Sequence, residues 1–412
     1  MSHEAVITGM GVVTAFGTDV NTFYDELAAG TVAIKPTPWM PKDSGLYAAL
    51  VQGFVPTDWM SPKVAEGTDR FAQYALAGTK MALDSAGISQ LDPLRTAIIF
   101  GTAMGGTGAL QRAQSLLERD GPDAVPRKTQ IQVWPNMAAA QVAMEYDLHG
   151  PSLTLCTACA SSIDAIGTAT RFIQAGLADV AITGAMEGSN SNIDFMPALS
   201  ANQISYGMVS PTTDHTKACR PFDRDRSGIA GGDGGGIFVI ESREHAEARG
   251  AKVLGVIRGY GSLSDGYHPS SPEPSGKWEA MVMRQALDDA GLGDGAGVAA
   301  IYAHGTGTPA GDAAEIRAIN DVYGYRGRDM LVTSLKGHFG HPGGSAAALN
   351  LAAALVGMQR GEVLPTASTT TPDPEIGFTL VLDKPQKADT SLIQLNAFGF
   401  GGQNASMIIS RE

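Results

Sequence analysis

Short apolar segments alternate along the chain with longer segments whose apolar residues recur at helical spacing. Residues 97–100 read AIIF and residues 299–304 read AAIYAH, each followed by a glycine, which is typical of strands buried on both faces. Residues 344–360 are apolar almost all round, so we expect a fully buried helix there. The alternation predicts an α/β fold with helices on both faces of its sheets.

The pattern occurs twice. In each copy a helix ends at a glycine and leads into a buried strand. The matches keep their order while their offset changes, which places insertions in the first half, mainly at 12–80 and 187–235. We therefore expect two related halves, 1–250 and 251–412, packed against each other. The matching segments are VITGMG (6–11) with VIRGYG (256–261), ALDSAG (82–87) with ALDDAG (286–291), and IESRE (240–244) with IISRE (408–412).

Composition excludes several classes of protein. A chain of 412 residues with 43% hydrophobic and 17% charged residues is long enough for two domains and buries extensive surface. A net charge of −13 disfavours nucleic acid and anionic membranes as partners, because both require a basic face. No secretory signal, membrane-length apolar run or disulfide framework is visible, so we expect a cytoplasmic location.

The segment LTLCTACASS (153–162) carries the first candidate for chemistry. An apolar strand leads through a small-residue turn into a helix that begins just after Cys159, and a helix N-terminus favours a thiolate. Two other interpretations remain open: a merely buried cysteine, or a C-x-x-C in which Cys156, placed in the strand pattern, forms a redox or zinc site with Cys159 and Cys219.

Three glycine-rich turns carry the other candidates. His304 ends a buried strand and is followed by Thr306 and Thr308, whose hydroxyls could hold a polar, amide-bearing arm. The segment SLKGHFGHPGG (334–344) follows a strand and contains a lysine and two histidines, one of which we expect to be a surface or packing residue. The segment NAFGFGGQNAS (396–406) offers main-chain N–H donors for an oxyanion and a movable aromatic ring.

These segments, in this order, resemble β-ketoacyl-acyl carrier protein synthases of the thiolase superfamily. The resemblance covers nearly the whole chain, and the combined pattern is highly specific. It implies a five-layered αβαβα fold, usually dimeric, either as a homodimer or as a heterodimer with a related ketosynthase-like subunit. The motifs that carry it include VITGMGVVTAFG (6–17), RPFDRDRSG (220–228), SDGYHPSSP (264–272) and GFGGQNAS (399–406).

The resemblance also implies the chemistry. Cys159 would receive an acyl group from an acyl carrier protein, and His304 and His341 would then assist condensation with malonyl carried on the same arm. Lys336 would support the histidines, and Phe400 would supply an oxyanion-hole N–H and gate the entry. His341 rather than His338 matches the family's motif.

Binding residues follow from the same resemblance. The family's pattern places the phosphopantetheine arm and the acyl chain against Thr306, Thr308, Met104, Gln203, Ser270, Ser271 and Gly401. No cofactor is expected to be bound by the enzyme itself, because the substrates arrive on the carrier's phosphopantetheine.

The chain departs from the family's pattern at several positions. Asn350 stands where many members carry a glutamate that pairs with the lysine. Gln203 replaces an aromatic residue of the acyl pocket, which suggests an acyl chain that is not simply saturated. Gly207 replaces a basic carrier-docking residue, and residues 61–70 offer only Lys63 and Arg70.

These departures favour a specialised synthase of a type II polyketide or polyene pathway over a housekeeping fatty-acid elongation enzyme. A non-catalytic partner subunit of the chain-length-factor kind would lack the cysteine, which this chain keeps. A thiolase would need a second catalytic cysteine near the C-terminus, whereas the last cysteine is Cys219.

Overall fold

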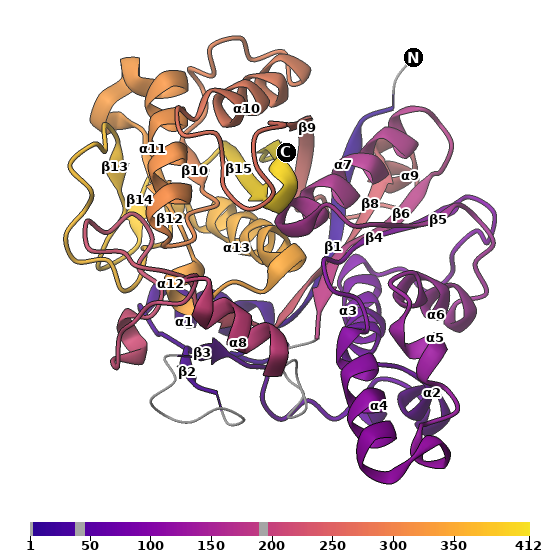
Figure 1. Cartoon of the computed structure of the whole chain (residues 1–412). Helices are drawn as coiled ribbons and strands as arrows, with labels where there is room; N and C mark the ends of the chain where they lie inside the picture. The colour runs from indigo at the N-terminus through magenta and orange to yellow at the C-terminus, as the bar shows by residue number, and fades with distance from the viewer. Residues whose placement is uncertain (1–2, 38–45, 189–196) are drawn as a thin grey trace.

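A computed structural model describes residues 3–37, 46–188 and 197–412 of the chain. Parts of both predicted insertions, residues 38–45 and 189–196, lie outside the described residues. The chain forms two halves that lie side by side, the first indigo to magenta and the second orange to yellow in Figure 1.

Eleven of the described strands form one large mixed sheet in which each half repeats the same strand order, and the other described strands form two small sheets. In the first half that order is β5 (Ser152–Leu155), β4 (Thr96–Gly101), β6 (Val180–Glu187), β8 (Gly234–Ser242) and β1 (Ala5–Val13). In the second half it is β11 (Leu331–Thr333), β10 (Ala300–Tyr302), β15 (Leu392–Gly399), β16 (Gln403–Ser410) and β9 (Gly255–Ser264), with β13 (Thr379–Leu380) added beyond β11.

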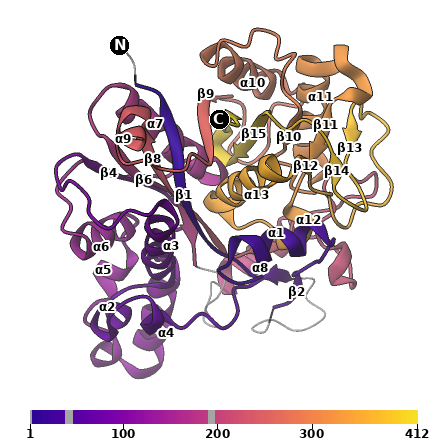
Figure 2. The same cartoon turned by 180° about the vertical axis from the view of Figure 1, so that it is seen from behind.

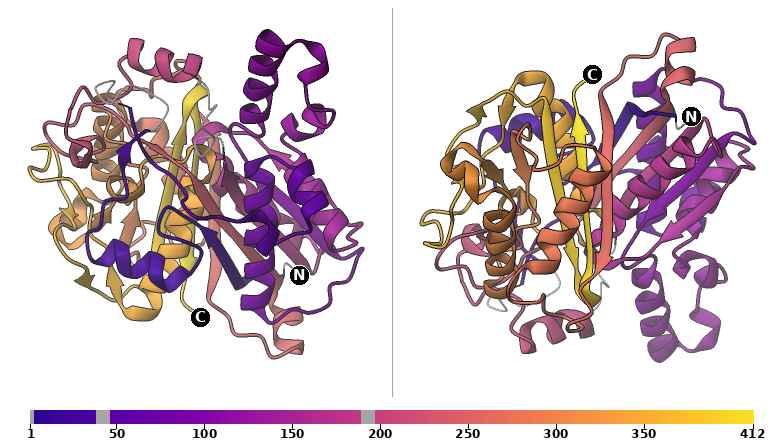
Figure 3. Two further views of the ribbon diagram at one scale, coloured as in Figure 1. Left: turned by 90° about the horizontal axis from the view of Figure 1, so that it is seen from below. Right: turned by 90° about the horizontal axis from the view of Figure 1, so that it is seen from above.

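The two halves join through a short antiparallel pairing of β1 with β9. Val6 lies opposite Val256, and Ile7 lies opposite Gly255. Val6, Ile7 and Val256 belong to the matching segments VITGMG and VIRGYG. Figure 3 shows the yellow strands of the second half near the middle of the molecule and the magenta strands of the first half to one side of them.

Helices cover both faces of each half-sheet and give five layers, which confirms the expected architecture. The outer layers are α3 (Arg70–Ala86) with α6 (Met137–Glu145) on the first half, and α10 (Lys277–Asp289) with α11 (Pro309–Tyr323) on the second. The central layer is α7 (Ser161–Gln174) beside α13 (Ala346–Arg360). Helix α13 is buried from Ala346 to Met358, as its apolar sequence predicts.

Matching glycines let each outer helix press against its strand. A Cβ added at Gly9 would lie 2.2 Å from the carbonyl oxygen of Ala82 in α3. A Cβ added at Gly259 would lie 2.2 Å from the carbonyl oxygen of Ala286 in α10. The repeat therefore preserves a close contact between strand and helix as well as the strand order.

The remaining elements belong to the insertions and connections. Figure 2 shows α2, α4 and α5 projecting from the first half, away from the second. Within the described part of the chain, no helix has the length and apolarity needed to cross a membrane. The bounds of these elements are α1 (Val20–Ala28), α2 (Pro62–Gly67), α4 (Thr107–Asp120), α5 (Thr129–Val133), α8 (Pro197–Ser205), α9 (Arg243–Ala248), α12 (Lys336–Phe339), β2 (Lys35–Pro36), β3 (Tyr47–Ala49), β7 (Gly231–Gly232), β12 (Glu362–Val363) and β14 (Gln386–Lys387).

Candidate active site

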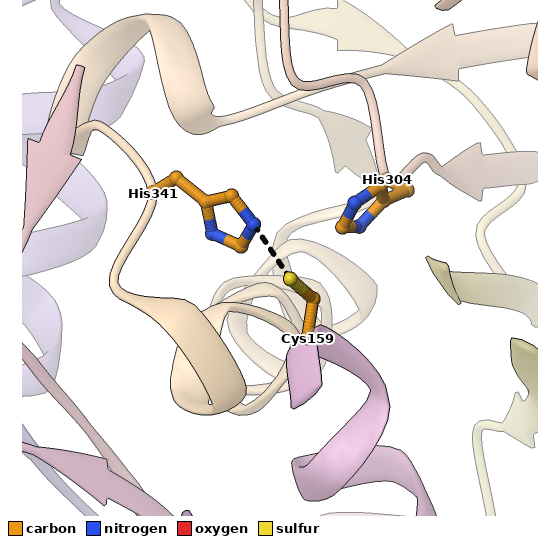
Figure 4. A group of neighbouring side chains, drawn as sticks. All are labelled: Cys159, His304 and His341. Atoms are coloured by element: carbon orange, nitrogen blue, oxygen red, sulfur yellow. Dashed lines mark hydrogen bonds between the residues drawn. The ribbon is translucent and has the colours of Figure 1, made fainter. Parts of the chain in front are cut away.

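The fold brings one cysteine and two histidines from distant parts of the sequence into one group. Nε2 of His341 lies 3.1 Å from Sγ of Cys159. The rings of His304 and His341 meet edge to face, with their centroids 5.4 Å apart. Figure 4 shows the sulfur between the two rings, with Cys159 directed from the start of a helix.

A strained turn presents the cysteine. Strand β5 ends at Leu155, and Ala158 adopts a left-handed φ of 49°, which is uncommon for a residue with a side chain. A 3₁₀ turn over Ala158–Ala160 then leads into α7. The turn is held by Ser161, whose Oγ accepts from the N–H of Thr157 at 2.9 Å and donates to the carbonyl of Ala158 at 2.6 Å.

Burial governs the acidity of the thiol more strongly than the helix N-terminus does. Burial raises the pKa of Cys159 to about 11, against the lowering effects of the Lys336 charge and of the N–H groups of Phe400 and Cys159. The expected preference of the helix N-terminus for the thiolate is therefore outweighed by burial. The two N–H groups nevertheless point at the sulfur and form a ready oxyanion site.

His304 is held from behind by a buried lysine and a buried carboxyl group. Nζ of Lys336 donates to the main-chain carbonyl of His304. Glu315 accepts from the main-chain N–H groups of His304 at 2.8 Å and Gly305 at 2.7 Å. Burial and the Lys336 charge hold the pKa values of His304 and His341 well below the usual range, so both imidazoles are neutral.

The amide at position 350 does not replace the missing glutamate as a partner of the lysine. Nδ2 of Asn350 lies 3.4 Å from the carbonyl of Ala303, and its buried Oδ1 has no hydrogen-bond partner among the described residues. Glu315 is instead the carboxyl group that acts most strongly on the pKa of Lys336, opposing the lowering by burial. Sequence reasoning missed Glu315, which lies about two helical turns beyond the HGTGT segment.

The two histidines of the SLKGHFGHPGG segment have different surroundings. His338 is buried, and its two ring nitrogens lie 2.9 Å from the carbonyls of Thr31 and Pro365, so it is the packing residue. His341 faces the sulfur, and its Nδ1 has no hydrogen-bond partner within the described residues.

A cavity of about 920 Å³ leads to these three side chains, which is a size typical of ligand sites. Gly401 does not belong to its wall; its N–H instead donates to the carbonyl of Pro269 at 2.8 Å and fixes the loop that carries Phe400. The predicted residues that do line the cavity are Met104, Gln203, Ser270, Ser271, Thr306, Thr308 and Phe400.

Two pairs of hydroxyl groups lie in the cavity wall. Oγ1 of Thr306 lies 2.8 Å from Oγ1 of Thr308, and Thr308 caps α11. The hydroxyl of Tyr206 lies 2.8 Å from Oγ of Ser270. Both pairs offer hydrogen-bonding groups to a long, amide-bearing arm.

Of the positions considered for carrier docking, two offer no free positive charge and one does. Gly207 ends the turn after α8 with a φ of 71°, which disfavours a residue with a side chain. Arg70 lies over the rings of Phe54 and Tyr74, at 5.6 and 6.0 Å from their centroids. Lys63 in α2 is exposed.

A second buried glutamate, Glu187 at the end of β6, was also missed by sequence reasoning. It accepts from the main-chain N–H groups of Ala103 and Gly344 and from the hydroxyl of Thr102. Burial raises the pKa of Glu187 to about 7. It lines the cavity and joins three loops around the nucleophile, but no sequence motif marks a lone glutamate at a strand end.

The alternative metal and redox interpretations receive different degrees of support. The ligand atoms of Cys159, His304 and His341 lie within 4.8 Å of one another, as a metal site would require. The buried Lys336 next to them opposes a further positive charge. All three cysteines are free; Cys219 is buried with Sγ 3.4 Å from the carbonyl of Thr306, and Cys156 is exposed just beyond β5 rather than within the strand.

Comparisons with known proteins agree with this geometry. Models of the β-ketoacyl synthase N-terminal and C-terminal domains match residues 3–246 and 254–370. The 3-oxoacyl-[acyl-carrier-protein] synthase 2 of Staphylococcus aureus (strain COL) is 33% identical over 414 residues, covering 100% of this chain and 99% of the relative. The enzyme of the same name from Vibrio cholerae is 33% identical, covering 99% of each chain.

Solved structures give the same result. The ishigamide ketosynthase/chain length factor is 30% identical with a TM-score of 0.91, and a β-ketoacyl synthase from Burkholderia phymatum is 31% identical with a TM-score of 0.89. Each alignment covers 100% of both chains. The chain therefore belongs to the β-ketoacyl synthase family.

Proposed function

We propose that the protein condenses an acyl thioester with a malonyl thioester, with loss of carbon dioxide, to form a 3-oxoacyl thioester. The observation that carries this proposal is the 3.1 Å contact between His341 and the thiol of Cys159, which also faces two main-chain N–H groups. Family membership supplies the reaction class.

In the first step, Sγ of Cys159 attacks the carbonyl of an acyl thioester. A C–S bond forms to Cys159, the bond to the carrier's sulfur breaks, and the thiol proton passes through His341 to the departing thiolate. The N–H groups of Cys159 and Phe400 stabilise the negative oxygen of the tetrahedral intermediate. Because burial raises the pKa of the thiol, attack and proton transfer are coupled.

In the second step, the malonyl thioester loses its carboxylate as CO₂. The neutral N–H groups of His304 and His341 donate to its thioester carbonyl and stabilise the enolate that forms. The enolate carbon attacks the Cys159 thioester, and the C–S bond to Cys159 breaks. The released thiolate takes up one proton from solvent, which restores the thiol. Lys336 and Glu315 act as positioning residues behind His304.

We propose that both substrates arrive on the phosphopantetheine of an acyl carrier protein, with the arm held by Thr306 and Thr308. No cofactor of the enzyme's own is part of this scheme. Carrier docking would depend on few basic groups, since Lys63 is exposed while Arg70 is engaged with aromatic rings.

A partner subunit could supply what this surface lacks. Strand β5 ends the described sheet with Ser152 and Leu153 exposed, and Met144 of the neighbouring helix α6 is 64% exposed. Bare edge strands favour pairing with another chain. We propose a dimer through this edge, with a second copy or a related ketosynthase-like subunit; a monomer at micromolar concentration in solution would contradict it.

We propose a specialised type II polyketide or polyene pathway as the setting. The cavity wall includes Asn202, Gln203 and Tyr206, which suit an acyl chain with polar or unsaturated groups better than a saturated one. The structural neighbours include a type II polyketide synthase ketosynthase in complex with its acyl-carrier protein, 26% identical with a TM-score of 0.89. We also propose a cytoplasmic location and a division of the chain into halves 1–250 and 251–412.

The relatives named 3-oxoacyl-[acyl-carrier-protein] synthase 2 favour a second candidate, housekeeping fatty-acid elongation. A donor panel separates the two: carriers loaded with saturated and polyunsaturated chains of equal length, each supplied with malonyl carrier. The proposed setting predicts faster formation of the 3-oxoacyl carrier from unsaturated donors. A saturated long-chain donor as the best substrate would assign the enzyme to fatty-acid elongation.

A further inference from the structure

Two buried polar groups in the cavity wall have no role in the scheme above. Glu279 in the first turn of α10 and Asn404 in β16 are each only 3% exposed, and both line the cavity. Neither Oε2 of Glu279 nor Nδ2 of Asn404 has a hydrogen-bond partner in the described part of the chain. Buried polar atoms are nearly always paired in proteins, so two unpaired ones in a cavity wall indicate a ligand.

The packing of α10 on β9 shows that Glu279 and Asn404 lie at the same position along the layer between α10 and the sheet. Added Cβ atoms at Gly259 and Gly261 would meet the carbonyls of Ala286 and Val282. A position two residues further along β9 therefore contacts α10 about one turn closer to the N-terminus of the helix.

Leu263, two residues beyond Gly261, therefore lies against the first turn of α10. Leu263 lies directly opposite Asn404 in the pairing of β9 with β16. Glu279 and Asn404 thus occupy the same end of the layer between α10 and the sheet, where the cavity passes.

The surroundings of Glu279 are acidic and hold it neutral. Among the described residues that line the cavity there is no lysine or arginine. Burial, followed by the charges of Glu315, Asp265 and Asp312, raises the pKa of Glu279 well above its usual range. A neutral carboxyl group offers a carbonyl oxygen as acceptor and an O–H as donor.

We infer that Glu279 and Asn404 form a polar subsite that binds an amide group of the phosphopantetheine arm. Nδ2 of Asn404 donates to the amide carbonyl, and a carboxyl oxygen of Glu279 accepts the amide N–H. An unpaired donor and an unpaired acceptor at the same end of this layer match an amide, whereas a cation would be repelled by the NH₂ group. The inference rests on the proposed use of a carrier-borne arm and adds a contact to the two threonines.

The test measures binding without requiring catalysis. S-methylpantetheine has two amides and S-methyl-N-acetylcysteamine has one; neither can acylate the enzyme. Each is titrated as a protectant of Cys159 against iodoacetamide, and the half-protecting concentration is recorded. If condensation itself were never observed, protection by these compounds would still report on the subsite, so the two failures are distinguishable.

Glu279→Ala is expected to raise the half-protecting concentration of S-methylpantetheine about fivefold, the typical effect of one lost hydrogen bond. Glu279→Gln, which keeps a neutral acceptor and donor, should stay within about twofold of the unmodified protein. Glu247→Gln, at an exposed glutamate of α9, is the matched control and should have no effect. Equal weakening of both compounds assigns the amide nearer the thiol, and weakening of S-methylpantetheine alone assigns the farther one.

Two results would overturn the inference. Unchanged protection in Glu279→Ala would show that the carboxyl does not touch the arm. Loss in Glu279→Gln equal to that in Glu279→Ala, with a melting temperature that potassium raises only in the unmodified protein, would assign the subsite to a cation.

The melting temperature of a Glu279 variant distinguishes a role of this residue in binding from a role in supporting the fold. An unpaired buried carboxyl lowers the stability of the folded state, so Glu279→Met should raise the melting temperature by about 2 °C while weakening protection. A fall in melting temperature would mean that Glu279 supports the fold.

Discussion

The two halves of the molecule use the same turn before their central helices for different purposes. In the first half, the 3₁₀ turn Ala158–Ala160 precedes α7 and carries Cys159 at its middle position. In the second half, the 3₁₀ turn Gly343–Ser345 precedes α13, and Gly344 occupies the middle position. A Cβ at Gly344 would lie 3.0 Å from the carbonyl oxygen of Ala158, so this turn has room only for glycine.

The ends of two matching strands also differ, and here it is the second half that carries the residue of the active site. By the offset that matches Gly101-Thr102 with Gly305-Thr306, Phe100 corresponds to His304. Phe100 is packed into the hydrophobic core of the first half, whereas His304 lies in the cavity wall. The comparison teaches that a duplicated scaffold can divide one chemistry: the first half supplies the nucleophile, and the second supplies the histidines.

Removing the nucleophile is expected to have the largest effect. Cys159→Ala should lower condensation by at least about 10³-fold, because no other thiol faces His341. The alanine fits a turn of small residues, so the melting temperature should change little. Cys156→Ala, three residues away, is the control; a comparable loss there would revive the dithiol interpretation.

Replacing His304 by phenylalanine, the residue at the matching strand end of the first half, should impair only the decarboxylation step. His304→Phe is expected to lower the rate of decarboxylation about 10²- to 10³-fold, since a donor to the malonyl carbonyl is lost. Acylation of Cys159, followed by mass spectrometry, should persist. Equal loss of both steps would mean that His304 also serves the first one.

Substitution of the matching glycines should destabilise the folded protein equally in the two halves. Gly9→Ala and Gly259→Ala each force a Cβ to 2.2 Å from a helix carbonyl, so each should lower the free energy of unfolding by about 2 kcal/mol. Chemical denaturation measures both. A large cost in one half and none in the other would show that the matching contacts are not equivalent.

The reactivity of the Cys159 thiol should depend on pH, with a modest change for each pH unit. Because the pKa of Cys159 is about 11, the thiolate is a minor species at neutral pH, and its fraction rises about tenfold per pH unit below that value. The rate of iodoacetamide alkylation should therefore rise continuously from pH 7 to 10. A plateau beginning near pH 8 would contradict a desolvated thiol.

Much of this arrangement could be predicted from the sequence, because it depends on local pattern. The repeat, the buried helix α13 and the turns carrying Cys159, His304 and His341 all have clear sequence signals. Glu187 and Glu279 have none, since each is a single acidic residue that only tertiary packing brings to the cavity. The raised pKa of the thiol and the exposure of Cys156 also depend on burial, which the local sequence does not determine.

The central claim is that Cys159 carries the acyl group, and one measurement tests it directly. The enzyme is mixed with an acyl carrier in the absence of malonyl carrier, digested, and its peptides are weighed. The account predicts the acyl mass on the peptide containing Cys159, at that residue, and its disappearance with formation of 3-oxoacyl carrier when malonyl carrier is added. Condensation without an adduct, or an adduct at Cys156 or Cys219, would contradict it.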